Sequence, residues 1–68
     1  MLKVDDVIEF NDGVNVRNFG IITEIYNDNN YVVYTGFEDK YYTLKDKDIR
    51  DIVHLTKKEY YDTFIKEI

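Results

Sequence analysis

The chain lacks cysteine, proline and tryptophan, and its 68 residues include only three glycines, one methionine and one histidine. Without cysteine it forms no disulfide framework and offers no thiolate to a metal. Small extracellular domains usually carry disulfides, so their absence favours a reducing compartment, and we expect a cytoplasmic protein. No apolar run approaches the roughly 18 residues that cross a bilayer, and the acidic start lacks the apolar stretch of a signal peptide.

The absence of proline, internal repeats and low-complexity linkers indicates a single folding unit. A chain this short buries only about 60% of the surface that its unfolded form exposes, so the core is thin. We expect a mainly β domain over residues 1–55, followed by a C-terminal helix over residues 56–68.

Basic residues are also scarce. The net charge is −5, and residues 1–34 hold six acids against two bases, whereas residues 35–68 hold eight against seven. Duplex-binding domains usually carry a basic stripe, because neutralising phosphates supplies most of their affinity. The charge balance therefore argues against direct DNA binding.

Five short runs rich in β-branched and aromatic residues are separated by clusters of Asn, Asp, Gly and Lys. Such runs predict strands joined by tight turns. The expected strands are Val4–Phe10, Phe19–Tyr26, Tyr31–Thr35, Lys40–Leu44 and Asp51–His54, with a 3₁₀ turn at Lys45–Asp48. Gly13 suits a turn with positive φ, and Gly20 marks a bulge or a close backbone approach. Alternation predicts one core made of Ile8, Phe10, Ile22, Ile25, Tyr31, Val33, Leu44, Ile49 and Ile52.

The last segment changes to a helical period. Thr56 and Glu59 have the spacing of a capping box. An apolar stripe follows at helical spacing, made of Tyr61, Phe64, Ile65 and Ile68. A helix of this length is too short to persist alone in water. We expect the stripe either to dock on the β domain or to pair with a second copy in a homodimer.

The order of these elements resembles the SH3-like small barrels of the KOW and Tudor type. The matching residues are Asp6, Ile8, Asp12, Gly13, Gly20, Ile22, Ile25, Tyr31, Val33, Leu44, Asp48 and Ile49. The resemblance implies a five-stranded SH3-like barrel with a C-terminal α-helix, and a module that binds nucleic acid or a ribonucleoprotein. The chain departs from the pattern in one loop, since 11–18 holds only Arg17 where many KOW domains carry several basic contacts.

The composition, rich in Asn, Ile, Lys, Tyr and Asp, also resembles that of small acidic proteins from phages of low-GC Gram-positive hosts. That resemblance implies an inhibitor of a host DNA-transaction protein, the replication sliding clamp among them, acting by DNA mimicry or by blocking a site in the host cytoplasm. This is the favoured function, and the nucleic-acid-binding module is the alternative.

Residues suited to catalysis are scarce. The chain has one histidine, His54, no cysteine, and no second histidine to complete a metal pair. Asp46 and Asp48 flank Lys47 without the spacing of a calcium loop. We therefore expect no enzyme activity, no cofactor and no metal site.

Exposed tyrosines and acids are the candidate partner-binding groups. Neighbours on a strand point to opposite faces, so Tyr41 and Tyr42 must separate, and Tyr34 faces away from Val33. Tyrosine is favoured at protein interfaces, whereas a negative surface steers a cationic partner. The candidate residues are Asp5, Asp6, Glu9, Asp12, Glu24, Tyr34, Tyr41 and Tyr42, and Asp28 is a further acid of the same half. The alternative is that these side chains are an ordinary solvated β-surface.

Overall fold

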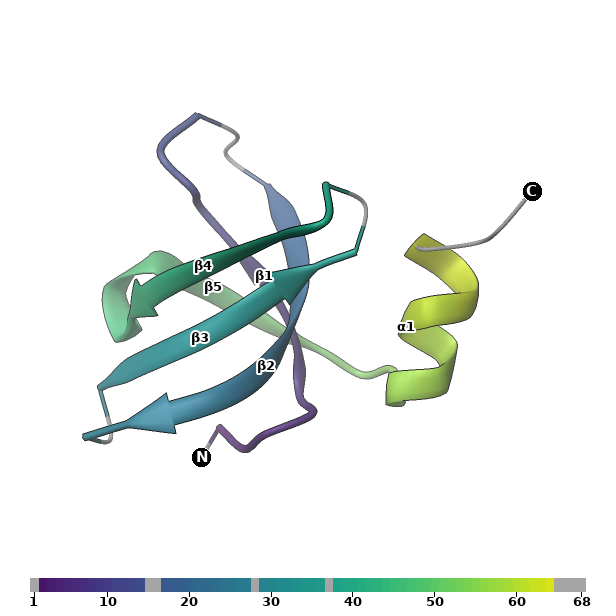
Figure 1. The fold of residues 1–68 in the computed structure, drawn as a ribbon, viewed down its shortest axis with the longest axis horizontal. Helices are drawn as coiled ribbons and strands as arrows, with labels where there is room; N and C mark the ends of the chain where they lie inside the picture. Colours follow the sequence, from purple (N-terminus) through teal and green to yellow (C-terminus); the bar gives the residue numbers. More distant parts are fainter. Residues whose placement is uncertain (1, 15–16, 28, 37, 65–68) are drawn as a thin grey trace.

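The structure is a computed structural model that describes residues 2–14, 17–27, 29–36 and 38–64. Within these residues the chain forms one antiparallel sheet of five strands, followed by one helix (Figure 1). The elements are β1 (Val7–Phe10), β2 (Asn18–Tyr26), β3 (Asn30–Thr35), β4 (Lys40–Lys45), the 3₁₀ turn η1 (Asp46–Asp48), β5 (Ile49–Val53) and α1 (Lys57–Phe64). The expected mainly β fold with a C-terminal helix is confirmed.

The strand order is β4-β3-β2-β1-β5, so β1 to β4 form a meander and β5 returns to pair with β1. Two predicted strand starts are wrong. The first strand starts at Val7 rather than Val4, because the preceding Asp5 adopts φ 79 in a turn. The last strand starts at Ile49 rather than Asp51, because Ile49 pairs with Phe10 beyond a register shift in the β1–β5 ladder.

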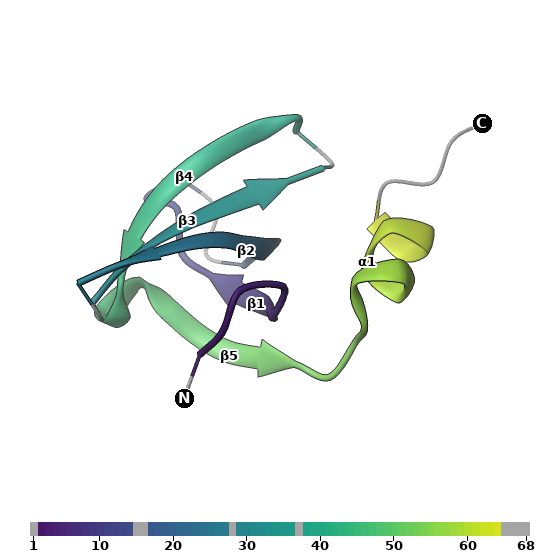
Figure 2. The same cartoon turned by 60° about the horizontal axis from the view of Figure 1, so that its bottom comes forward.

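The larger of two apolar clusters, here called the inner cluster, consists of Ile8, Phe10, Ile22, Tyr31, Val33 and Leu44. Leu2, Ile25, Tyr42 and Ile49 pack against it. No described residue of α1 belongs to this cluster, so the sheet itself must curve around it, as Figure 2 shows. The predicted core is confirmed except at Ile52, which is 38% exposed because β5 stands at one end of the strand order in the described sheet.

A register shift in β2 explains how Ile22 and Ile25 both join the inner cluster. In a regular strand, side chains three residues apart point to opposite faces. Ile22 pairs with Val33 and Glu24 pairs with Val32, so Thr23 is an extra residue in the ladder. The Thr23 hydroxyl donates a hydrogen bond to the Val32 carbonyl (3.2 Å). This bulge resets the alternation and returns Ile25 to the inner side.

Of the two alternatives predicted for Gly20, a bulge or a close backbone approach, the structure shows the close approach. A Cβ at this position would lie 2.4 Å from Cγ1 of Val33 and 2.9 Å from the carbonyl oxygen of Tyr34. Both distances are shorter than van der Waals contact, so only glycine lets β2 approach β3 here without displacing a neighbour.

The opposite face of the same strands carries the outer cluster, made of Val7, Ile21 and Tyr60. Tyr60 of α1 is fully buried, and its hydroxyl accepts a hydrogen bond from the Gly36 amide (3.1 Å). The helix therefore docks on its own sheet through Tyr60, and Figure 1 shows it beside the sheet. The homodimer stays a prediction.

Within the single chain, Tyr60 rather than Tyr61 is the residue that docks α1 on the sheet, and pairing of the stripe with a second copy stays a prediction. Tyr61 is 36% exposed, and its ring meets the edge of the Tyr60 ring at a centroid distance of 5.6 Å. The side chain of Phe64, and residues Ile65 and Ile68, lie outside what the structure describes. The buried position is one residue earlier because a tyrosine is held there by packing and by its hydroxyl together.

The capping box at the start of α1 is confirmed in both directions. The Glu59 amide donates to Oγ1 of Thr56 (3.1 Å), and the Thr56 amide donates to Oε1 of Glu59 (2.8 Å). These reciprocal bonds satisfy two backbone donors that the first turn of a helix leaves unpaired. They fix the point at which the chain turns from β5 into the helix.

Candidate functional site

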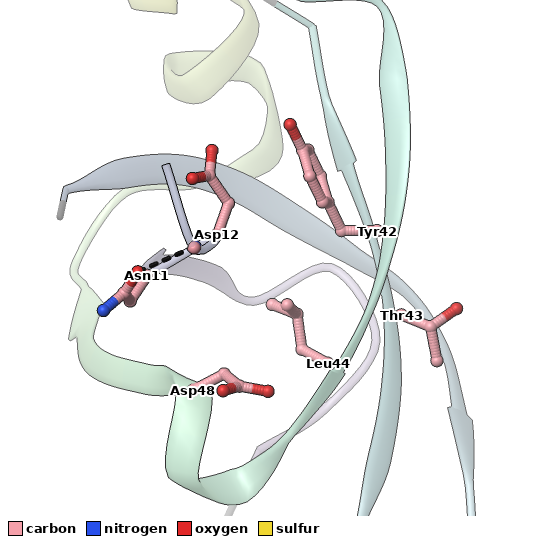
Figure 3. A pocket seen from close by; sticks show the side chains of 7 residues that line it. Asn11, Asp12, Tyr42, Thr43, Leu44 and Asp48 are labelled. Atoms are coloured by element: carbon pink, nitrogen blue, oxygen red, sulfur yellow. Dashed lines mark hydrogen bonds between the residues drawn. The ribbon is translucent and has the colours of Figure 1, made fainter. Parts of the chain in front are cut away.

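A pocket of about 360 Å³ lies between the loop after β1, strand β4 and the turn η1 (Figure 3). It is lined by Asn11, Asp12, Gly13, Tyr42, Thr43, Leu44 and Asp48. Figure 3 shows Tyr42 and Leu44 on one side of β4, while the side chain of Thr43 points to the other side. The alternation along β4 thus places an aromatic ring and an aliphatic group on the pocket side.

Backbone hydrogen bonds fix the rim of this pocket. The Gly13 amide donates to Oδ1 of Asn11 (2.8 Å), and Gly13 adopts φ 90, which favours glycine. The Asn11 amide donates to the carbonyl oxygen of Asp48 (3.0 Å), which ties the loop to η1. The carboxylate of Asp48 accepts the Lys45 amide (3.0 Å). These bonds therefore hold the loop after β1 and the turn η1 at a fixed separation across the pocket.

Four side chains at one end of the pocket form a hydrogen-bonded group, here called the acidic network: Asp12, Asn18, Glu38 and Tyr42. The Asn18 side-chain amide donates to Oδ2 of Asp12 (2.9 Å) and to Oε1 of Glu38 (3.1 Å). The Tyr42 hydroxyl donates to the same Glu38 oxygen (2.9 Å). Residues from β2, β4 and the two loops therefore converge on a pair of carboxylates.

The acidic network keeps Glu38 ionised. Hydrogen bonds from Asn18 and Tyr42 hold the pKa of the Glu38 carboxyl below its usual value. The same Glu38 carboxylate raises the pKa of Tyr42 to about 12, because the phenol donates to it. The buried Thr35 hydroxyl also lies within reach of Glu38 (3.3 Å). At neutral pH the network is therefore negative, with a neutral phenol.

Of the predicted acids, the structure places Asp12 at this pocket and the others elsewhere. Glu9 lies 2.7 Å from Arg17 and 3.9 Å from Arg50, so its charge is balanced locally. Asp5 lies 3.7 Å from Lys57 of α1. Asp6 accepts the Lys3 amide and Glu24 accepts the Tyr26 hydroxyl. Asp28 lies outside the described residues.

The predicted tyrosines lie on two faces. Tyr41 and Tyr42 separate as expected, and Tyr42 turns toward Phe10 with a ring centroid distance of 5.4 Å. Tyr34 and Tyr41 pair across β3 and β4 on the outer face, with ring centroids 4.9 Å apart. Tyr41 is 67% exposed, whereas Tyr34 is half-buried against the outer cluster. The Tyr34 hydroxyl donates to Asp39 (2.9 Å), which raises the pKa of Tyr34 to about 12.

Sequence reasoning missed Asn18, Glu38 and Asp48 as site residues. Asn18 and Glu38 are 20 positions apart, and no local pattern pairs them. Asp48 matches no site motif, because Asp46 and Asp48 lack the spacing of a calcium loop. One signal was present, since the Asn11-Asp12-Gly13 turn directly follows β1 and the Asp46–Asp48 turn directly precedes β5, and these two strands pair.

No protein-family model, no curated protein and no solved structure matches this chain. Within the described residues no group of three or more His, Asp or Glu side chains is arranged to hold a metal ion. His54 is exposed just after β5. Across the same residues, no helix is long and apolar enough to span a membrane.

Proposed function

We propose that the curved sheet is an SH3-like barrel. Three features support this. The strand order is β4-β3-β2-β1-β5, a 3₁₀ turn directly precedes the last strand, and the inner cluster is made of residues from β1 to β4 with no described residue of α1. A sheet that curves around its own core in this way leaves its loops at the ends free to contact other molecules.

The function that we propose is non-catalytic binding to a positively charged surface of another protein. The observation that carries it is the acidic network at the pocket, where Asp12 and Glu38 share the Asn18 amide and Asp48 stands on the facing wall. Fixed carboxylates on a chain of net charge −5 attract a cationic partner over long range and speed association.

A protein that normally encloses or grips DNA offers the complementary positive surface, because it is built to face phosphates. The proposed partner is therefore a host DNA-handling protein, with the replication sliding clamp as the specific candidate, and the chain acts as an inhibitor by mimicking DNA or blocking its site. Nucleic-acid binding, the alternative, would use the exposed Tyr41 ring for stacking, but the same net charge opposes it.

The test compares two triple variants with the same change of charge. The site variant carries Asp12→Asn, Glu38→Gln and Asp48→Asn. The control carries Asp51→Asn, Asp62→Asn and Glu67→Gln. Each variant removes three negative charges, so the net charge rises from −5 to −2 in both. Each substitution keeps a carbonyl oxygen that can accept a hydrogen bond, which limits structural damage.

The three proteins are immobilised and exposed to a nuclease-treated lysate of a low-GC Gram-positive bacterium. Purified hits, and a purified sliding clamp, are then measured for association rate at several salt concentrations. We expect a DNA-handling protein whose association rate falls with salt, is little changed by the control variant and is strongly reduced by the site variant. Retention of nucleic acid instead, or equal loss in both variants, would overturn the proposal.

A further inference from the structure

The pocket combines two kinds of surface that a single ligand must satisfy together. Leu44 is nearly buried and forms an apolar floor, and the Tyr42 ring forms a wall beside it (Figure 3). Asp12 and Asp48 contribute carboxylates, and none of the seven lining residues is basic. The matching ligand has an apolar stem and a cationic end.

The size of the pocket limits the ligand further. Pockets that take drug-sized molecules have volumes of roughly 300–1,000 Å³, so about 360 Å³ is near the lower limit. Gly13 leaves the rim open, because a Cβ there would meet no atom within 4 Å. One extended side chain entering past Gly13 fits this shape better than a folded segment does.

The carboxylates are held in place by neutral donors. Asp12 accepts the Val14 amide (2.8 Å) as well as the Asn18 side chain, and Asp48 accepts the Lys45 amide (3.0 Å). These donors orient both carboxylates, and none of the residues that line the pocket is basic. Glu38 adds a third negative charge through its bond to the Tyr42 hydroxyl.

We propose that this pocket receives an arginine side chain of the partner protein. The aliphatic stem lies on Leu44, the guanidinium stacks against the Tyr42 ring, and the carboxylates of Asp12 and Asp48 accept its hydrogen bonds. The inference rests on the proposed function, since it specifies the chemistry by which that same site recognises a cationic protein surface.

Arginine suits the pocket better than lysine for two reasons. Its planar guanidinium stacks on an aromatic ring and offers five donors in a fixed fork, whereas the lysine ammonium is a compact and strongly hydrated charge. Two carboxylates beside one ring therefore make more contacts with arginine. Affinity should follow the order arginine, then lysine, then a neutral isostere.

The probe is an acetylated and amidated pentapeptide with one arginine between glycine pairs. The controls are the same peptide with lysine, or with citrulline, which has almost the shape of arginine and no charge. Each is titrated into isotope-labelled protein, and backbone amide shifts are followed by NMR. We expect saturable shifts at Gly13, Leu44 and Asp48 with arginine, weaker ones with lysine and none with citrulline.

Two single variants test the site directly. Asp48→Asn should weaken the arginine peptide about tenfold, the loss expected for one charge-assisted hydrogen bond. Asp62→Asn on α1 removes the same charge and should leave the affinity unchanged. Unshifted pocket amides, or equal weakening in both variants, would overturn the inference, because the attraction would then be non-specific.

The experiments distinguish failure of the arginine pocket from failure of the proposed function. If the site triple variant loses a DNA-handling partner while the arginine peptide leaves the pocket amides unshifted, the binding function stands and the arginine pocket falls. If the peptide binds the pocket while no DNA-handling protein binds the intact chain, the pocket stands and the proposed function falls.

Discussion

The two faces of the sheet are filled by different means, although the same strands supply both. The inner cluster draws residues from four strands, with Ile49 of the fifth strand packed against it. The buried members of the outer cluster are Val7 and Ile21 from the sheet and Tyr60 from α1, and Phe19, Tyr34 and Val53 of the sheet pack against them. The buried members of the inner cluster therefore all come from strands, whereas the outer cluster includes one side chain from the helix.

Neighbouring isoleucines on β2 offer the sharpest test of this difference. Ile22 belongs to the inner cluster and Ile21 to the outer cluster, and both are almost fully buried. Truncating a buried isoleucine to alanine costs about 2–5 kcal/mol, depending on how well the surroundings collapse. We expect Ile22→Ala in the upper half of that range, enough to unfold much of so small a domain.

Ile21→Ala should fall in the lower half of the range, because α1 can shift toward the space that is left. Chemical denaturation followed by circular dichroism gives both free energies of unfolding. If both variants lost the same free energy of unfolding, the helix would be unable to shift into the space left at Ile21.

Gly20→Ala tests the distance between β2 and β3 that the inner face requires. The added methyl group would lie 2.4 Å from Cγ1 of Val33. Overpacking of this kind costs about 1–3 kcal/mol, and we expect the same loss in the free energy of unfolding. A variant as stable as the parent chain would show that the strands separate freely at this point.

Tyr60→Phe and Tyr61→Phe compare a buried and an exposed hydroxyl on the same helix. Removing the Tyr60 hydroxyl leaves the partly buried Gly36 amide without the acceptor described here, which costs about 1–3 kcal/mol. Tyr61→Phe should change stability by less than about 0.5 kcal/mol. Hydrogen exchange in α1, measured beside denaturation, should quicken only in the Tyr60 variant.

Alkaline titration probes one tyrosine on each face. Tyr34 on the outer side and Tyr42 on the inner side both have a pKa raised to about 12 by a carboxylate acceptor. An unfolded tyrosine titrates near about 10, so between these values the folded state holds protons that the unfolded state has lost. Stability is then complete below about pH 10 and falls as the pH rises toward about 12.

Two single variants test which carboxylate raises the pKa of each tyrosine. Asp39→Asn should lower the pKa of Tyr34 alone, and Glu38→Gln should lower that of Tyr42 alone, as followed by ring carbon shifts in NMR. If either variant moved both tyrosines, the two faces would be coupled through β4 rather than independent.

The inner face was predictable from sequence because it follows a local rule. Alternation along each strand selects Ile8, Phe10 and Val33. It does not account for Ile25, which reaches the inner side through the bulge in β2, or for the exposed edge position Ile52. The outer face was not predictable, because the helical stripe that begins at Tyr61 fits the period better than Tyr60 does. What selects Tyr60 is the Gly36 amide, 24 positions away in the chain.

The candidate site likewise contains some residues that could be predicted from the sequence and some that could not. Asp12 and Tyr42 stood out as an acid in a turn and an aromatic on a strand. Asn18 and Glu38 did not, because their roles arise only when the fold brings the β1–β2 and β3–β4 loops together. A side chain that bridges two loops carries no signal in the sequence around it.

The contact between the Tyr60 hydroxyl and Gly36 joins the helix to the segment that carries the acidic network. Thr35 and Gly36 are adjacent, and the Thr35 hydroxyl lies 3.3 Å from Glu38. Docking of α1 and occupation of the pocket thus act on one short stretch of backbone. By thermodynamic reciprocity, a ligand that steadies Glu38 should slow the local opening of the helix, and a loosened helix should weaken the ligand by the same factor.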